Sequence, residues 1–150
     1  YIDGAKQDGA KLIYGGKRIN LDAGTTNTQG YYIEPTIFDN VNPQQKLAQE
    51  EVFGPVLSVL TFKDEVEAIQ LANNTCYGLA AYAATESLAR AQRLARQLNS
   101  GYLSIVGSTA LSDGGVDIGS EPHRQSGFGY ETGIAALASY TVSTSVHLFT

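Results

Sequence analysis

Residues 56–106 alternate between strand patterns and helix patterns, and this order constrains the fold more than any other feature of the sequence. The stretch begins with a near-continuous apolar run within 55–62, which is typical of a strand covered on both faces. Further strands are predicted at 79–84 and 102–106. Strands separated by helices are joined by right-handed crossovers, which produce parallel pairing. The sequence therefore predicts an α/β fold with a mainly parallel sheet.

The two helices between these strands have recognisable start signals. Asp64, followed three residues later by Glu67, has the pattern of a capping box, which satisfies free N–H groups at a helix start. Thr85 or Ser87 is expected to cap the second helix. Its apolar residues, which recur at helical spacing, are Leu88, Ala91, Ala95 and Leu98. Each helix is therefore predicted to be a crossover between two strands.

The flanking segments are less regular. Before residue 56 the patterns predict a helix end or turn in 1–10, a strand at 11–14 that Gly15-Gly16 ends, a surface loop at 17–30, an extended segment at 31–38 and a helical turn at 43–50. After residue 106 they predict an irregular stretch at 107–130 and a short helix around 134–138. Residues 140–149 alternate apolar and polar side chains, which predicts a terminal strand whose apolar face needs a partner.

Charge and cysteine usage exclude several classes of protein. The net charge is −5 and the ten Lys and Arg are scattered, which argues against a nucleic-acid partner. No apolar stretch approaches the roughly 18 residues of a membrane helix, and no secretory signal is visible. Cys76 is the single cysteine, so an intrachain disulfide and a multi-cysteine zinc site are excluded. We expect a cytoplasmic protein without a metal site, a membrane contact or a nucleic-acid partner.

Several short motifs occur along the chain in a defined order. They are EEVFGP at 50–55, ANNT at 72–75, YGLAA at 77–81, Gly101 after a long helix, SGFG at 126–129, Glu131 and Gly133, and Tyr140-Thr141 before the terminal strand. Together they resemble the C-terminal part of the NAD(P)-dependent aldehyde dehydrogenase superfamily. The resemblance covers essentially all of the chain, and the ordered set is much more specific than any one motif.

The resemblance implies a function for a larger protein. In this family a cysteine thiolate attacks an aldehyde, the thiohemiacetal gives hydride to NAD or NADP, and a glutamate base activates the water that releases the acid. Those groups and the Rossmann-like dinucleotide domain precede the matched region, and no segment here resembles them, so no catalytic residue is assigned. The resemblance implies that 1–139 belong to the three-layer catalytic domain and 140–150 form the oligomerisation strand of a homo-oligomer.

Two residues match the family's cofactor contacts. Glu51 corresponds to a glutamate that accepts hydrogen bonds from the nicotinamide ribose, and a carboxylate suits this task because it is acceptor-only. Phe53 corresponds to an aromatic residue that packs beside the nicotinamide. The structural alternatives are a solvated glutamate near a helix end and a core phenylalanine that leads into the strand at 56.

The sequence departs from the family pattern around 106–130. Glu121 and Pro122 replace glycines, while Val106 and Tyr130 stand where asparagine and arginine are common. These changes motivate two alternatives, a non-catalytic structural or assembly homologue and one subunit of a split enzyme. Arg124 stands where the family usually has a lysine and keeps its positive charge. His123 is interpreted as a surface histidine.

Two further features bear on activity. Cys76 lies outside any nucleophile motif and is interpreted as an incidental thiol. The chain contains no methionine, so we expect a piece of a longer protein. The isolated chain is accordingly expected to be inactive.

Overall fold

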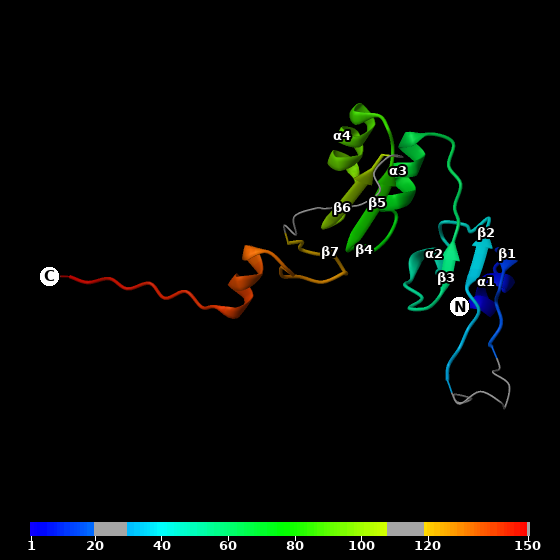
Figure 1. The fold of residues 1–150 in the computed structure, drawn as a ribbon, viewed down its shortest axis with the longest axis horizontal. Helices are drawn as coiled ribbons and strands as arrows, with labels where there is room; N and C mark the ends of the chain where they lie inside the picture. Colours follow the sequence, from blue (N-terminus) through cyan, green and yellow to red (C-terminus); the bar gives the residue numbers. More distant parts are fainter. Residues whose placement is uncertain (20–29, 108–118, 150) are drawn as a thin grey trace. The chain divides into compact units, whose positions relative to one another are not determined.

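The computed structural model describes residues 1–19, 30–107 and 119–149. The chain divides into two compact units, Tyr1–Asn74 and Thr75–Thr150. Both units contain helices and strands (Figure 1), so the predicted α/β class is confirmed.

The first unit is a three-stranded sheet with three helices. Its elements are α1 (Ile2–Gln7), β1 (Lys11–Tyr14), β2 (Thr36–Asp39), α2 (Lys46–Gln49), β3 (Val56–Ser58) and α3 (Glu65–Asn73). The strand order is β1-β2-β3, with an antiparallel β1–β2 pair and a parallel β2–β3 pair. The helical, strand and extended segments predicted before residue 56 are confirmed, whereas 20–29 of the predicted loop lie outside the described residues.

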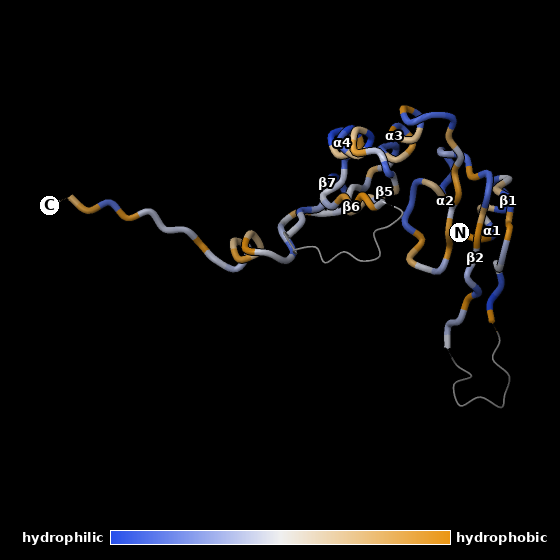
Figure 2. Tube along the Cα trace, turned by 45° about the horizontal axis from the view of Figure 1, so that its top comes forward, coloured by the Kyte–Doolittle hydropathy of each residue, from blue (hydrophilic) through white to orange (hydrophobic). Residues whose placement is uncertain are grey.

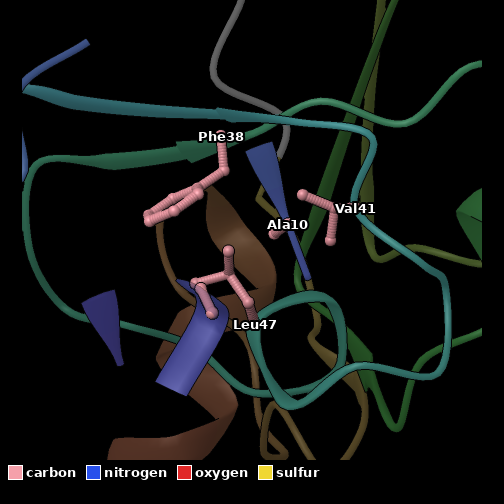
Figure 3. Close-up of a cluster of buried hydrophobic side chains, with 5 residues drawn as sticks. Ala10, Phe38, Val41 and Leu47 are labelled. Carbon is pink, nitrogen blue, oxygen red and sulfur yellow. The ribbon is translucent and has the colours of Figure 1, made fainter. Parts of the chain in front are cut away.

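The central strand β2 carries the core of this unit. Its side chains alternate between the buried and the partly exposed side, and Phe38 is fully buried. The buried apolar cluster consists of Ala5, Ala10, Phe38, Val41 and Leu47. The side chains of Phe38, Val41 and Leu47 converge in Figure 3, so one aromatic ring joins β2 to α2.

Thr36 is the buried polar residue of the same strand, and its hydrogen bonds are satisfied. Its hydroxyl accepts a hydrogen bond from the Gly16 N–H at 2.9 Å and donates to the Glu34 carbonyl at 2.8 Å. Its own N–H donates to the Pro55 carbonyl at 2.8 Å. These bonds fix the turn after β1 and the segment before β3 to the central strand.

Gly15 shows why β1 ends where the sequence predicted. Its φ is +71°, and a Cβ at this position would lie 2.0 Å from the Pro35 carbonyl oxygen. A glycine is therefore required both by the backbone conformation and by the close approach of the two chains.

The capping signal of α3 is confirmed with one difference. Asp64 Oδ1 accepts from the Glu67 N–H at 2.9 Å, as the motif predicts. The Glu67 carboxylate, however, accepts from the N–H of Lys63 at 2.7 Å rather than from that of Asp64. Two reciprocal hydrogen bonds therefore still cap the helix start, but the one that Glu67 accepts comes from the residue before the N-cap.

One prediction for the strand after residue 55 is not met within this unit. The apolar run indicated a strand covered on both faces, but Leu57 is 57% exposed. The physical reason is that β3 packs on the core of this unit through Val56 on one face only, while Leu57 lies on the opposite face.

The second unit contains the predicted strand–helix–strand crossover. Its elements are β4 (Tyr77–Gly78), β5 (Ala80–Ala84), α4 (Leu88–Gln97), β6 (Tyr102–Val106), β7 (His123–Arg124) and the 3-10 helix η1 (Ile134–Tyr140). The β5–β6 pair is parallel and in register from Ala80–Tyr102 to Ala84–Val106. Both predicted cap residues of α4 contribute, because Ser87 accepts from the Arg90 N–H and Thr85 accepts from the Ser87 N–H.

The strand pairing is more mixed than the sequence indicated. The described strands form three separate hydrogen-bonded sheets. Pairs β2–β3 and β5–β6 are parallel, while β1–β2 and β4–β7 are antiparallel. The strand β7 was not predicted, because it is two residues long and carries no apolar alternation. A single mainly parallel sheet therefore stays a prediction.

The terminal segment 141–149 follows η1 and has no assigned strand among its described residues. Its apolar side chains face solvent, with Val142, Leu148 and Phe149 exposed by 94%, 86% and 97%. Figure 2 shows the alternation of hydrophobic and hydrophilic residues along it. An extended segment of this kind becomes a strand only when a partner supplies the other half of the hydrogen bonds.

Helices long and apolar enough to cross a membrane are absent from the part of the chain described here.

Replacing Phe38 by alanine is expected to destabilise the first unit by about 3 kcal/mol or more, because the ring is fully buried and leaves a cavity. Phe62→Ala serves as the matched control, since Phe62 is 60% exposed in the same unit. The control is expected to stay within about 0.5 kcal/mol of the parent. Urea unfolding followed by circular dichroism measures both variants, and equal losses would contradict the assigned core.

Candidate functional site

The run 50–55 joins α2 to β3 and is fixed at three points. The Glu50 N–H donates to the Lys46 carbonyl at 2.9 Å, which closes α2. Val52 packs against the buried cluster. The Pro55 carbonyl accepts from the Thr36 N–H on β2. The segment is thus held by backbone hydrogen bonds at its ends and by an apolar contact in its middle.

Between these points, two side chains project outward. Glu51 is exposed, and Phe53 is 90% exposed. Between them Val52 is partly buried and packs against the buried cluster, so the segment is attached to the core through this residue while its two neighbours are exposed. Phe53 is therefore no core residue of this chain. An exposed carboxylate and an exposed aromatic ring, two residues apart, are instead available to a ligand.

The backbone at Phe53 has an uncommon conformation. Its φ is +47°, in the left-handed region, which costs a non-glycine residue about 1–2 kcal/mol. The next residue makes a tight turn in which the Val56 N–H donates to the Gly54 carbonyl at 2.7 Å. A Cβ on Gly54 would have open space, with its nearest neighbour at 3.9 Å. The Phe53 ring therefore projects into solvent from a turn at 53–54.

Glu50 behaves differently from its neighbour Glu51. Its carboxylate accepts a hydrogen bond from the Tyr1 hydroxyl at 2.6 Å and lies 3.6 Å from Lys46 Nζ. The Lys46 ammonium group also lies 5.2 Å from the centre of the Tyr1 ring. Sequence reasoning missed this cluster because Tyr1 and Glu50 are 49 positions apart, although the i, i+4 spacing of Lys46 and Glu50 was a visible signal.

The histidine and arginine singled out in the sequence lie in the second unit. Both belong to β7, which pairs with β4. Arg124 Nη1 donates to the Thr75 carbonyl at 2.6 Å. With its amide oriented to satisfy both neighbours, Asn99 donates to His123 Nδ1 at 2.7 Å and accepts from Arg124 Nη2 at 3.0 Å. His123 is exposed as expected, but its contacts tie β7 to the turn after α4.

Cys76 lies in the same network through its backbone. Its carbonyl accepts from the Gln125 N–H at 3.0 Å, and its side chain is partly buried. The Ser126 hydroxyl accepts from the Gly78 N–H at 2.9 Å. The SGFG motif thus holds β4 in place. Among the described residues, His, Cys, Asp and Glu form no cluster that could hold a metal ion.

Gly101 is the point of closest approach in this unit. A Cβ here would lie 1.8 Å from the Glu121 carbonyl oxygen and 3.2 Å from the Pro122 Cα. The Gly101 N–H donates to the Gly78 carbonyl at 2.9 Å. Glu121 and Pro122, two of the residues that depart from the family pattern, therefore pass directly over a glycine that the pattern includes.

These features agree with a comparison to known proteins. The model of the aldehyde dehydrogenase family matches residues 1–146. The chain belongs to this family. It is 41% identical over 148 residues to the betaine aldehyde dehydrogenase of Sinorhizobium fredii, covering 99% of this chain and 29% of that protein. It is 38% identical to the aldehyde dehydrogenase tropH of Talaromyces stipitatus, covering 99% of this chain and 28% of that protein.

Solved structures of aldehyde dehydrogenases have the same fold. An indole-3-acetaldehyde dehydrogenase of P. syringae, in complex with NAD+, matches with a TM-score of 0.81 and 45% identity over 93% of this chain and 27% of that one. The betaine aldehyde dehydrogenase of Staphylococcus aureus, also in complex with NAD+, matches with a TM-score of 0.79 and 38% identity over 95% and 27%. The chain thus spans less than a third of the length of these aldehyde dehydrogenases.

Substitution of Gly101 by alanine is expected to destabilise the second unit by about 1–3 kcal/mol, because the added methyl group meets backbone atoms that cannot move independently. The matched control is Gly4→Ala in α1, where a Cβ meets nothing within 4 Å. That change is expected to leave stability equal or about 0.5–1 kcal/mol higher. Thermal unfolding of both variants checks the pair, and a neutral Gly101→Ala would refute the close approach.

Proposed function

We propose that this chain is part of an NAD(P)-dependent aldehyde dehydrogenase that oxidises an aldehyde to a carboxylic acid, and that it supplies contacts to the nicotinamide ribose. The observation that carries the proposal is the segment 50–55, in which Glu51 and Phe53 point outward from a backbone anchored at both ends. The family membership of the chain and the NAD+ complexes of its structural neighbours support it.

Glu51 fits the ribose by its chemistry. Its carboxylate is exposed, and as an acceptor-only group it can take two hydroxyl donors from a diol. Charge-assisted hydrogen bonds of this kind are worth about 1.5–3 kcal/mol each. In the proposed site the carboxylate binds and orients the ribose and does not take part in bond making.

Phe53 complements this contact with an apolar surface. Its ring is 90% exposed although its backbone conformation is costly. A flat aromatic face of this kind offers packing area to a planar ring and excludes water from one side of it. When bound, NAD(P)+ accepts the hydride from the aldehyde carbon. Both residues act beforehand, by holding the cofactor in the orientation that the transfer needs.

The reacting groups would lie in other parts of the protein. We assign the cysteine that forms the thiohemiacetal, the glutamate base and the dinucleotide domain to segments outside 1–150. We assign residues 1–139 to the C-terminal portion of a three-layer, mainly parallel catalytic domain. Cys76 takes no part, because it lies outside any nucleophile motif, in a partly buried turn whose carbonyl accepts from the Gln125 N–H. We place the whole enzyme in the cytoplasm.

Residues 140–150 are proposed to be an oligomerisation strand. Val142, Val146 and Leu148 are exposed by 94%, 72% and 86% along one side of an unpaired segment. Addition to the edge of a neighbouring subunit's sheet would bury this face and satisfy its backbone groups. The partner would be a second copy of the same protein.

A non-catalytic assembly homologue is the second candidate, since Glu121 and Pro122 occupy the approach to Gly101. A subunit of a split enzyme is the third. All three share the fold, and they differ in whether a complete protein turns over an aldehyde.

Glu51→Gln is expected to lower the rate of hydride transfer about tenfold or more in the protein expressed from its complete gene, because an amide makes weaker and differently directed contacts with the ribose. Single-turnover formation of NADH, followed by absorbance, measures the change. The first aldehydes to supply are betaine aldehyde and indole-3-acetaldehyde, after which the relatives are named.

Asp3→Asn is the control for this variant. It also removes one negative charge from the first unit, and its side chain is 93% exposed. It is expected to leave the rate within about twofold of the parent. The isolated 150-residue chain is expected to form no NADH and provides the blank. An unchanged rate for Glu51→Gln would remove this residue from the site, and a complete protein without activity would favour the assembly homologue.

Aspartates introduced at Val142 and Val146 are expected to weaken self-association at least tenfold, since two charges would be buried at the proposed interface. Aspartates at Ser143 and Ser145, on the other side of the segment, are the matched control. Sedimentation velocity across a concentration series compares the two variants. Equal association in both would show that the alternating face does not make the contact.

A further inference from the structure

A cluster of three exposed side chains lies beside the proposed cofactor segment. The Tyr1 hydroxyl donates to Glu50 Oε2 at 2.6 Å, and Lys46 Nζ lies 3.6 Å from the same oxygen. The Lys46 ammonium group also lies 5.2 Å from the centre of the Tyr1 ring. Each member therefore contacts the other two, which distinguishes this cluster from an isolated surface ion pair.

The cluster is connected to the core through α1. The Tyr1 carbonyl accepts from the N–H of Ala5, which is 3% exposed and belongs to the buried cluster. At the other end of the same helix pair, Gln45 Nε2 donates to the Asp8 carbonyl at 2.5 Å. Hydrogen bonds thus join α1 and α2 at both ends, with the start of α1 beside the end of α2.

Glu50 connects these contacts to the proposed cofactor site. Glu50 is the C-cap residue of α2 and has extended backbone, with φ −117° and ψ 150°. Glu51 follows it directly. A side chain held at position 50 limits the rotation of the peptide that carries Glu51, while Val52 limits it from the other side through the core.

We propose that Tyr1 and Lys46 act as positioning residues for the cofactor site, by clamping Glu50 so that the backbone of Glu51 and Phe53 is held in its binding conformation. This inference rests on the proposed function, and it assigns a task to the first glutamate of the EEVFGP motif. The Tyr1 hydroxyl is the principal element, because its bond to a carboxylate is short and charge-assisted. The ion pair is longer and joins side chains that are 64% and 47% exposed, so it contributes less.

The clamp acts on local order rather than on global stability. Its members are exposed, and none belongs to the buried cluster. Loss of the hydroxyl therefore leaves the core intact and lowers the fraction of molecules in which 51–53 have the binding conformation. A ligand that needs this conformation binds more weakly in proportion to that fraction.

The test compares Tyr1→Phe with Tyr14→Phe in the protein expressed from its complete gene. The first change removes the hydroxyl and keeps the ring beside Lys46. The second removes the hydroxyl of Tyr14, which is 62% exposed on β1. Tyr1→Phe is expected to raise KM for NAD+ about two- to fivefold with little change in melting temperature. The control is expected to change neither quantity.

A double-mutant cycle with Glu51→Gln separates positioning from a general structural effect. If Tyr1 acts through Glu51, Tyr1→Phe has little further effect on kcat/KM for NAD+ once Glu51 is glutamine. A rise in KM that vanishes in that background supports the clamp. An unchanged KM, or a full effect in the Glu51→Gln background, overturns the inference and leaves the proposed function standing.

Hydrogen exchange provides a readout that does not require activity. The hydrogen-bonded amides of Glu50 and Val56, which flank the segment, are expected to exchange about two- to fivefold faster in Tyr1→Phe than in the parent, and at the parent rate in Tyr14→Phe. Unchanged exchange in Tyr1→Phe overturns the clamp whatever the enzyme does. Faster exchange together with an inactive parent protein would keep the clamp as a structural device and reject its role in cofactor binding.

Discussion

Burial of Phe38 is the interaction on which the first unit depends. Its ring belongs to a cluster of five buried residues, in which the other members are two alanines, one valine and one leucine. No other aromatic side chain among the described residues is fully buried. Because α1 and α2 contribute Ala5 and Leu47 to this cluster, both helices pack in the same core as the ring of β2. The position of segment 50–55 follows from that of α2.

Thr36 and Phe38 make different kinds of contact from the central strand. Both point to the buried side of β2, two residues apart. The phenylalanine supplies apolar contact, and the threonine supplies three hydrogen bonds that organise the turn after β1 and the entry to β3. Glu51 and Phe53 therefore lie next to a sheet in which the buried polar groups of Thr36 have hydrogen-bond partners. A small core of this kind can hold a binding segment in place even though its own residues are few.

Many apolar side chains of this chain have no cover, and their distribution is informative. Phe53, Phe128 and Phe149 are exposed by 90%, 96% and 97%. Single apolar residues on a surface are ordinary, but exposure of this many large apolar side chains is typical of a chain that contacts another segment or ligand. This agrees with a chain that spans less than a third of the length of its relatives.

The sequence by itself determined the local elements and the family. The cap at Asp64, the glycine stop after β1 and the crossover from β5 to β6 all follow from residues close together in the chain, where side-chain periodicity and capping chemistry act directly. The sequence also identified Glu51 and Phe53 as candidates through an ordered set of motifs.

Only the tertiary structure decided which side chains meet. The contact of Tyr1 with Glu50, the passage of Glu121 over Gly101 and the pairing of β7 with β4 join residues that are 20 to 49 positions apart. No local pattern marks such contacts, because they arise when separate elements pack together. The exposure of Leu57 and Phe53 was likewise beyond local patterning, since burial depends on which neighbours the fold supplies and not on the hydrophobicity of the residue.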